Sequence, residues 1–209
     1  MFAAWVVRRD GWRLEDCGAE VPEAPGAAPD VRVLHASLAG PSSEAARALH
    51  QRFEQLMFFF IDGLTQIQRS DPGWEVLFAC VQHRPAGGQP QWVPVGIAAL
   101  YRHFHYPDKT RLKLSQLFVL PPCRGRGVGR QLLRAAQEMA LSDAGVVDFT
   151  LEDPTPIVTR MRDVAGALLR DDKGACDGGV CTCVAKVPSV RPAVCSTFAH
   201  ACASWYDIT

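Results

Sequence analysis

The sequence predicts an α/β (α+β) fold, in which one mixed sheet is covered by helices. Three observations support this prediction. The 209 residues are 48% hydrophobic, which is enough to fill one core, and the chain is too short for two large domains. Segments with the two-residue period of strands are interspersed with segments that have the period of helices. A glycine-rich turn joins an apolar strand to a helix.

The N-terminal part predicts little regular structure. Phe2–Arg9 shows a loose strand-like alternation, and Cys17–Asp30 has the Pro, Ala, Gly and Glu content of a linker. Val31–Leu38 is a short strand candidate. We therefore assign residues 1–40 to a remnant N-terminal region or linker, and expect the main domain to occupy residues 41–170.

The strongest helix signal opens at Pro41–Glu44 and continues over Ala45–Ile67, where apolar residues recur at helical spacing. Ser70–Gly73, with the sequence Ser-Asp-Pro-Gly, then interrupts the chain. The apolar positions of this predicted helix are Leu49, Phe53, Leu56, Met57, Phe60, Ile61 and Leu64.

Three strand candidates follow and are expected to pair as a meander. They are Trp74–Val81, Trp92–Tyr106 and Arg111–Leu120. After the glycine-rich turn, the periodicity predicts a helix over Val128–Ala140, a strand over Val146–Leu151 and a helix over Thr155–Arg170. This order is typical of a mixed sheet with helices packed on it.

Charge and hydropathy argue against two classes of partner. Lysine plus arginine and aspartate plus glutamate each number 22, so the formal net charge is zero and gives no support for bulk binding to nucleic acid or anionic membrane. The longest apolar runs, Met1–Val7 and Leu56–Ile61, are far too short to span a bilayer. Met1–Trp12 lacks the basic start of a secretory signal. We therefore expect a soluble intracellular protein.

The C-terminal segment, residues 171–209, differs in character from the rest. Gly174–Thr209 shows neither period, and five of the eight cysteines lie between Cys176 and Cys202. Their spacing lacks the paired C-x-x-C pattern of zinc sites, so we expect no metal and reduced thiols. We expect this segment to be an atypical, cysteine-rich and disordered tail.

The most informative motif is Arg124–Gly129, with the sequence Arg-Gly-Arg-Gly-Val-Gly, placed between a strand and a helix. A pyrophosphate needs several backbone N–H donors that converge on it. Glycines give the required clearance, and the following helix adds unpaired N–H groups. The motif matches neither a Walker loop nor a Rossmann fingerprint. An ordinary tight turn is the alternative interpretation.

The motif Arg124-x-x-Gly127-x-Gly129 after an apolar strand resembles the acetyl-CoA loop of the GNAT acetyltransferases. Within that superfamily, three further segments resemble the catalytic subunit of type B histone acetyltransferases, and the resemblance extends from about Val31 to Arg170. These segments are Tyr106–Arg111 (YPDKTR), Leu114–Leu120 and Glu152–Pro154. The resemblance implies transfer of an acetyl group from acetyl-CoA to a lysine ε-amine of newly made histone H4 and, to some extent, of a second core histone.

The resemblance also implies a mostly antiparallel sheet with a splayed central pair of strands at the acetyl-CoA site. Leu117, Phe118 and Val119 match the positions whose backbone groups contact the acetyl-pantetheine arm. The pyrophosphate site is matched by Arg124, Gly125, Arg126, Gly127, Val128, Gly129 and Arg130.

Three carboxylates match catalytic positions of the family. Glu152 matches the general base, which must remove a proton from the acceptor ammonium (ordinary pKa about 10.4) before the amine can attack. Asp153 and Asp62 match two further carboxylates near the acceptor lysine. Each also has a structural interpretation. Asp153 precedes Pro154 and is a candidate helix N-cap, whereas Asp62 and Glu152 are candidates for solvated surface residues.

Tyr101, Arg102 and His103 match the strand positions along which the histone tail lies in the family. Arg102 places a positive charge where the family is usually neutral, and like charge would weaken binding of a basic peptide. For Tyr101, as for Phe104 and Tyr106, packing in the sheet is the alternative.

The resemblance implies the histone H4 tail and a WD-repeat histone chaperone as partners, and locations in the nucleus and the cytoplasm. The short N-terminal region and the unfamiliar tail depart from the family, as expected of a truncated or variant form. Two other functions therefore stay open: a GNAT enzyme for another amine, and a catalytically impaired remnant that binds acetyl-CoA.

Overall fold

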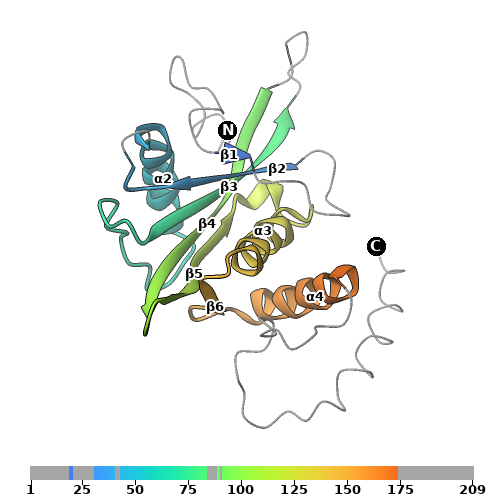
Figure 1. The fold of residues 1–209 in the computed structure, drawn as a ribbon. Coiled ribbons are helices and arrows are strands. Elements are labelled where there is room, and N and C mark those ends of the chain that lie inside the picture. The colour runs from blue at the N-terminus through green and yellow to red at the C-terminus, as the bar shows by residue number, and fades with distance from the viewer. Residues whose placement is uncertain (1–18, 21–30, 41–42, 84–88, 90, 174–209) are drawn as a thin grey trace.

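A single sheet forms the centre of the computed structural model, which describes residues 19–20, 31–40, 43–83, 89 and 91–173 (Figure 1). The predicted strand Phe2–Arg9 and the cysteine-rich tail lie outside these residues. The strands follow the order β1-β2-β3-β4-β5-β6, and only the last pair is parallel. They are β1 (Ala19–Glu20), β2 (Val31–Ser37), β3 (Trp74–His83), β4 (Gln91–His105), β5 (Lys109–Val119) and β6 (Val146–Leu151).

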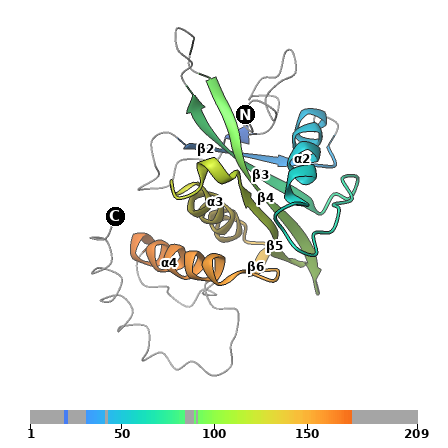
Figure 2. The same ribbon diagram turned by 180° about the vertical axis from the view of Figure 1, so that it is seen from behind.

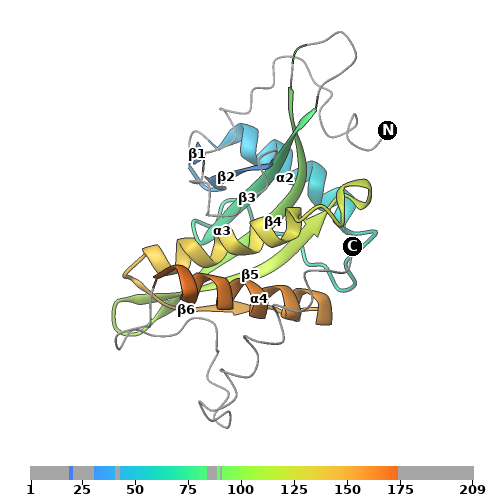
Figure 3. The ribbon, with the colours of Figure 1, turned by 90° about the vertical axis from the view of Figure 1, so that its right-hand side faces the viewer.

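Helices cover both faces of this sheet. The helices are α2 (Glu44–Met57), α3 (Val128–Ser142) and α4 (Pro156–Lys173), with a 3₁₀ turn, η2, at Pro121–Cys123. α2 lies on one side of the strands, and α3 and α4 lie beside each other on the other side (Figures 2 and 3). None of the described helices combines the length and the apolar character needed to cross a membrane.

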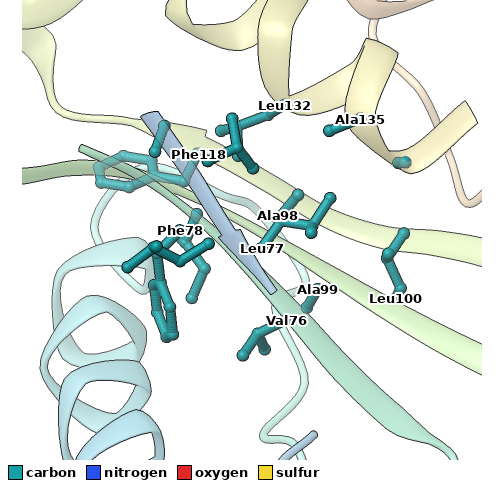
Figure 4. Close-up of a cluster of buried hydrophobic side chains, with 14 of the residues drawn as sticks. Val76, Leu77, Phe78, Ala98, Ala99, Leu100, Phe118, Leu132 and Ala135 are labelled. Atoms are coloured by element: carbon teal, nitrogen blue, oxygen red, sulfur yellow. The ribbon is translucent and has the colours of Figure 1, made fainter. Parts of the chain in front are cut away.

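The core extends on both sides of the strands, because successive side chains of a strand point to opposite faces. Figure 4 shows Leu132 and Ala135 of α3 above one face, and Val76 and Phe78 of β3 directed toward the other. The largest fully buried side chains are Phe53, Phe78, Leu38, Leu49, Met57, Leu77, Ile97, Leu100, Leu112, Leu120, Leu132 and Leu133.

The predicted order of helix, three-strand meander, helix, strand and helix is confirmed. β6 has the predicted bounds, and β2 to β5, α3 and α4 differ from the prediction only at their ends. β1, which pairs with β2, was not predicted, because it lies in the segment Cys17–Asp30 that we interpreted as a linker. The sheet includes β2, which pairs with β3 along its whole length and lies before residue 41, where we placed the start of the main domain. α4 likewise continues beyond residue 170, to Lys173.

The first helix is shorter than predicted, because α2 ends at Met57 and not at Ile67. Phe59 is 82% exposed, and Gly63 adopts a left-handed backbone (φ 70°), so the chain leaves the helix and turns back. The backbone N–H of Ile67 then donates to Oε1 of Glu54 in α2 (3.0 Å). The apolar residues after Met57 therefore continue the core from a returning loop, which helical periodicity alone does not distinguish from a longer helix.

Strands β5 and β6 separate, as the resemblance implied, although β6 is the edge strand of the described sheet and the pair is therefore not central. Their parallel pairing runs from Thr110 opposite Val146 to Leu114 opposite Leu151, whereas β5 continues to Val119. The last link between them is the hydrogen bond from the Glu152 N–H to the Leu114 carbonyl (2.9 Å). Residues 116–119 are therefore paired with β4 only, and the other edge of residues 115–119 is not covered by β6.

A β-bulge lies in β5 where the separation begins. Leu114 is opposite Leu100 and Gln116 is opposite Ala99, so Ser115 has no partner residue in β4. A bulge changes the direction of the side chains on one strand, and bulges are common beside active sites. No sequence pattern indicated this bulge, although the bulge determines which side chains of β5 lie beside Glu152.

Candidate active site

The glycine-rich turn leads from the end of β5 into α3. Gly125 and Gly127 both have left-handed backbones (φ 77° and 78°), a conformation that costs other residues about 1 kcal/mol or more. A Cβ added at either glycine would meet no atom within 4 Å, so the space in front of both glycines is open. The turn is therefore accessible from outside.

The N-terminus of α3 offers unused donors next to this turn. Gly127 is the N-cap, no side chain caps the helix, and the first helical hydrogen bond runs from the Gln131 N–H to the Gly127 carbonyl (3.1 Å). The N–H groups of Val128, Gly129 and Arg130 therefore have no carbonyl within the helix to which they could donate. Together with the helix dipole, these groups favour an anion such as a diphosphate.

The three arginines of the turn have different roles. Arg126 and Arg130 are exposed beside the free N–H groups. Arg124 instead donates from Nε to the Val119 carbonyl (3.0 Å), and its guanidinium lies over the rings of Phe60 and Phe118 (5.5 and 5.7 Å to the ring centres). In this structure Arg124 thus joins the turn to β5 and to the loop after α2.

The predicted pantetheine positions lie in the part of β5 that pairs with β4 but not with β6. The ring of Phe118 is buried and contacts Phe60 (5.3 Å between ring centres), so it points toward the loop that follows α2. Val119 points the other way, since a Cβ added to the neighbouring Gly96 would meet both Val119 and Leu132 of α3. Leu117, which precedes Phe118 in the strand, is half-buried.

Glu152 immediately follows β6 and receives two side-chain hydrogen bonds from β5. Nζ of Lys113 lies 2.8 Å from Oε1, and the hydroxyl of Ser115, the bulge residue, donates to Oε2. We call these three residues the Glu152 cluster. Hydrogen bonds from Lys113 and Ser115 outweigh partial burial and lower the pKa of Glu152 below its ordinary 4.5. Glu152 is therefore a carboxylate at neutral pH and can accept a proton.

A row of aromatic side chains leads to this cluster. The hydroxyl of Tyr101 donates to Oδ2 of Asp71 (3.1 Å), which raises the pKa of Tyr101, and the Tyr101 ring contacts His103 (4.5 Å between ring centres). His103 is near enough to Glu152 to contribute to its lowered pKa. Gly73 allows this arrangement, because a Cβ there would lie 2.7 Å from the Tyr101 ring.

One atom of this row lacks a partner. Nε2 of His103 is buried and makes no hydrogen bond to any described residue. Buried polar atoms are normally paired, so an unpaired one beside a carboxylate indicates a position where a ligand or an ordered water completes the site.

Arg102 does not lie with Tyr101 and His103, contrary to our prediction for the substrate-binding strand. Its guanidinium pairs with Glu75 (2.5 Å) and with Asp143 (2.7 Å), and Nε2 of His35 contacts the other oxygen of Glu75 (2.8 Å). We call these four residues the Arg102 clamp. Because Asp143 is the C-cap residue directly after α3, Arg102 points to the α3 side of the sheet. Tyr101, its neighbour in the strand, points to the α2 side.

The two other predicted carboxylates are exposed and lie outside the cluster. Asp153 follows Glu152 with a left-handed backbone (φ 37°), an uncommon conformation that Asp tolerates better than most residues. It does not cap α4, because the Val158 N–H is near the hydroxyl of Thr155 (3.4 Å). Asp62 lies in the loop after α2, two residues beyond Phe60. The cap interpretation of Asp153 was therefore wrong, and the catalytic interpretation of both residues stays a prediction.

Sequence reasoning missed Lys113, Ser115 and Asp71. A signal existed for the first two, since Lys113 and Ser115 are polar residues that alternate with leucines close to the recognised motif. Nothing in the sequence showed that Asp71 would bond to a tyrosine thirty residues later. Within the described residues, no group of histidine, cysteine, aspartate or glutamate is arranged to hold a metal ion.

Known proteins give an independent indication of what this site is. Residues 51–154 match the acetyltransferase (GNAT) family. Two curated relatives, both named histone acetyltransferase type B catalytic subunit, are 32% identical to the chain. The Arabidopsis thaliana protein aligns over 126 residues, which are 60% of this chain and 26% of that protein. The Rattus norvegicus protein aligns over 117 residues, which are 56% and 28%.

The chain therefore spans about a quarter of the length of these relatives. Among solved structures, a Trypanosoma brucei acetyltransferase superposes with a TM-score of 0.44 at 18% identity, over 66% of this chain and 92% of that one. Overlap at that level says nothing about the reaction. The family match, the mixed sheet and the separated β5 and β6 agree with one another. The chain contains an acetyltransferase domain of the GNAT family.

Proposed function

We propose that this chain transfers the acetyl group of acetyl-CoA to the ε-amine of a lysine in the N-terminal tail of histone H4. The observation that carries the proposal is the position of Glu152, an ionised carboxylate at the point where β5 and β6 separate. The printed names of the curated relatives support a histone as the acceptor, and the type B resemblance supports H4.

The co-substrate is expected to bind on the α3 side of the sheet. Its diphosphate would accept hydrogen bonds from the N–H groups of residues 125–130, and Arg126 and Arg130 would add positive charge. The pantetheine arm would follow the uncovered edge of residues 115–119, which offers backbone donors and acceptors that β6 does not use. The thioester would then reach the α2 side through the separated strands.

The acceptor lysine is expected to approach from the α2 side, where Glu152 lies with Tyr101 and His103. Glu152 would take a proton from the ammonium, directly or through a water, and so free the lone pair that attacks the thioester carbonyl. The C–N bond forms, the C–S bond breaks, and the thiolate of CoA leaves and takes up the second proton that the nitrogen loses as it becomes an amide. Exposed acidic side chains at Asp62 and Asp153 would favour a basic peptide.

The position of Arg102 supports a peptide acceptor. A free arginine on the substrate strand would repel a basic tail, but its charge is held by Glu75 and Asp143 on the opposite side of the sheet. The sequence suggested that a positive charge at Arg102 would weaken the binding of a histone tail. In this geometry that objection does not apply.

Purified protein given acetyl-CoA and an H4 tail peptide tests the proposal. We expect release of free CoA and acetylation of one peptide lysine, and no release with a peptide in which the lysines are replaced by norleucine. Release only with small amines would favour a GNAT enzyme for another amine. Binding of CoA without any turnover would favour a catalytically impaired remnant, and would reject the proposal.

The same resemblance extends the proposal to a WD-repeat histone chaperone as partner, and to the nucleus and the cytoplasm as locations. Copurification of the tagged chain with such a subunit, and microscopy of the tagged chain, test these two points. Recovery of the chain without a WD-repeat protein, or its exclusion from both compartments, would contradict them.

A further inference from the structure

The candidate base of this enzyme already has an amine beside it. Nζ of Lys113 lies 2.8 Å from Oε1 of Glu152, within the ordinary range for a charge-assisted hydrogen bond. The pair is not a buried structural one, since the side chains of Lys113 and Glu152 are 28% and 41% exposed. Both atoms therefore remain accessible to the reagents of the active site.

The backbone holds Lys113 at this point from both sides. Lys113 is opposite Tyr101 of β4 and opposite Thr150 of β6, so it lies within the last fully paired stretch of β5. Ser115, two residues later, begins the edge that β6 leaves uncovered. The backbone of Lys113 is thus fixed next to the opening between the strands, while its long side chain stays flexible.

The position of this amine has a chemical consequence, which rests on the proposed function. A base that acts directly must lie within hydrogen-bond distance of the amine it deprotonates, and the thioester carbonyl must lie within reach of that same amine. The amine that the structure places beside Glu152 belongs to the chain itself. In the absence of a peptide, Lys113 therefore meets the first of these two requirements.

We propose that Lys113 is an acetylation site of this enzyme, modified by its own active site when acetyl-CoA is bound and no acceptor is present. Glu152 takes one proton from the Lys113 ammonium, and the nitrogen lone pair attacks the carbonyl carbon of the thioester. The C–N bond forms, the C–S bond breaks, and CoA leaves as its thiolate, which takes up the second proton that the nitrogen loses as it becomes an amide. The products are one amide at Lys113 and free CoA.

Acetylation would change what the acceptor encounters. The neutral amide of acetyl-lysine no longer forms an ion pair with Glu152, so an incoming ammonium would not have to displace a cation. The unmodified enzyme, by contrast, presents an internal competitor to its substrate. The modification would therefore favour binding of a lysine peptide.

Mass spectrometry tests the proposal with the other lysines as internal controls. The chain has only four lysines, at positions 109, 113, 173 and 186. Lys109 begins the same strand and donates to the Ala144 carbonyl (3.2 Å), away from Glu152. After incubation with acetyl-CoA alone, we expect acetylation of Lys113 at a rate at least about a hundredfold above Lys109, the lower end of what a general base contributes.

Three variants sharpen this experiment. Lys113→Arg keeps the cation but should lose the modification, and Lys109→Arg should leave acetylation of Lys113 unchanged. Glu152→Gln should lower the rate at Lys113 by about a hundredfold or more. Thermal unfolding of each variant shows whether it is folded. Equal labelling of Lys109 and Lys113, or labelling of Lys113 that survives Glu152→Gln, would reject the proposal.

A second readout needs no acetyl-CoA. Lys113→Gln imitates the neutral acetylated side chain, so calorimetry should show that a lysine peptide binds it up to about fivefold more tightly than the wild type, the contribution of an exposed ion pair. A norleucine peptide should bind both proteins equally. Equal affinity of the lysine peptide for both proteins would contradict the idea that Lys113 occupies the acceptor position.

Failure of this inference is distinguishable from failure of the proposed function. If the H4 peptide is acetylated while Lys113 stays unmodified, self-acetylation is rejected and the enzyme assignment stands. If CoA binds but neither the peptide nor Lys113 is modified, both are rejected. If Lys113 alone is modified, the inference holds and the acceptor proposed above is wrong.

Discussion

Tyr101 and Arg102 are neighbours in β4, yet their side chains belong to two polar networks on opposite faces of one sheet. Arg102 belongs to the clamp, in which Glu75 accepts hydrogen bonds from both Arg102 and His35. Burial alone would raise the pKa of Glu75, but these two partners outweigh burial and lower it. Tyr101 belongs to the row that ends at the Glu152 cluster, where Nε2 of His103 has no partner among the described residues.

The difference shows how one sheet supports both stability and reactivity. The clamp joins β2, β3 and β4 to the end of α3, and its charges are mutually satisfied. The Glu152 cluster lies where two strands have separated and is more exposed, and beside it Nε2 of His103 has no hydrogen-bond partner among the described residues. We expect changes in the clamp to affect mainly unfolding, and changes in the cluster to affect mainly turnover.

The largest expected effect is on turnover. Glu152→Gln should lower kcat by about 10²–10⁴-fold, the usual contribution of a general base, while the affinity for CoA and the Tm change little. A CoA-release assay, calorimetry and thermal unfolding measure these quantities. Glu138→Gln is the matched control, because Glu138 also pairs with a cation (Arg134, 3.2 Å) but lies on α3. An equal loss in both variants, or a collapse of CoA affinity in Glu152→Gln, would show that Glu152 is structural.

A smaller effect concerns the pH dependence of the free energy of unfolding. It involves a third polar network, around His50. His50 of α2 is buried, Arg69 contacts its Nδ1 (3.4 Å), and burial lowers its pKa from 6.5 to about 4. Between these values the unfolded chain binds a proton that folded His50 does not. Stability from His50 is thus complete above pH 6.5 and is lost as the pH falls toward 4, by roughly 3 kcal/mol in total.

The variant His50→Gln should remove this part of the pH dependence, whatever its absolute stability. Urea unfolding at several pH values between 6.5 and 4 measures it. An unchanged pH slope in the variant would assign the loss of stability to other groups.

The clamp gives the next effect. Arg102→Met should lower the free energy of unfolding by about 2 kcal/mol, because Glu75 would be left mostly buried with one fewer cation. Arg111→Met is the control, since Arg111 is exposed and its pair with Asp148 should contribute at most about 1 kcal/mol. The KM for an acceptor peptide should stay the same in both. If Arg102→Met changed KM without changing stability, Arg102 would contact the substrate, as we propose for Tyr101.

The smallest effect separates backbone strain from cofactor binding. Gly127→Glu should lower CoA affinity by tenfold or more, about 1.4 kcal/mol, because its bulk and negative charge would occupy the diphosphate position. Gly63→Glu is a matched control, with a similar backbone (φ 70° against 78°) and open space around it. Both variants should lose about 1 kcal/mol of stability from the strained backbone, but only the first should lose affinity. Equal CoA affinity in the two would place the diphosphate elsewhere.

The sequence was informative where one periodicity applied to a whole element. The alternation of Val146–Leu151 predicted β6 with its observed bounds, and Val128 was correctly predicted to begin α3. The prediction from periodicity failed where tertiary contacts determine the structure. After Met57, for example, a loop held by Glu54 continues the apolar pattern of the helix.

The candidate site shows the same division. The glycine turn and Glu152 were recognisable because their residue types and order carry the chemistry. The bulge at Ser115 was not, since it depends on the pairing of two distant strands, and without it the position of Lys113 could not be foreseen. The direction of Arg102 likewise depends on Glu75 and Asp143, which are remote in sequence.

A crystal structure of the chain with CoA bound is the most direct test of the central claim, that the separated β5 and β6 guide a thioester from the glycine turn to Glu152. We expect the diphosphate on the N–H groups of residues 125–130, the pantetheine arm along residues 115–119, and the sulfur on the side of Glu152. A CoA molecule bound elsewhere, or a glycine turn that stays empty beside bound CoA, would contradict it.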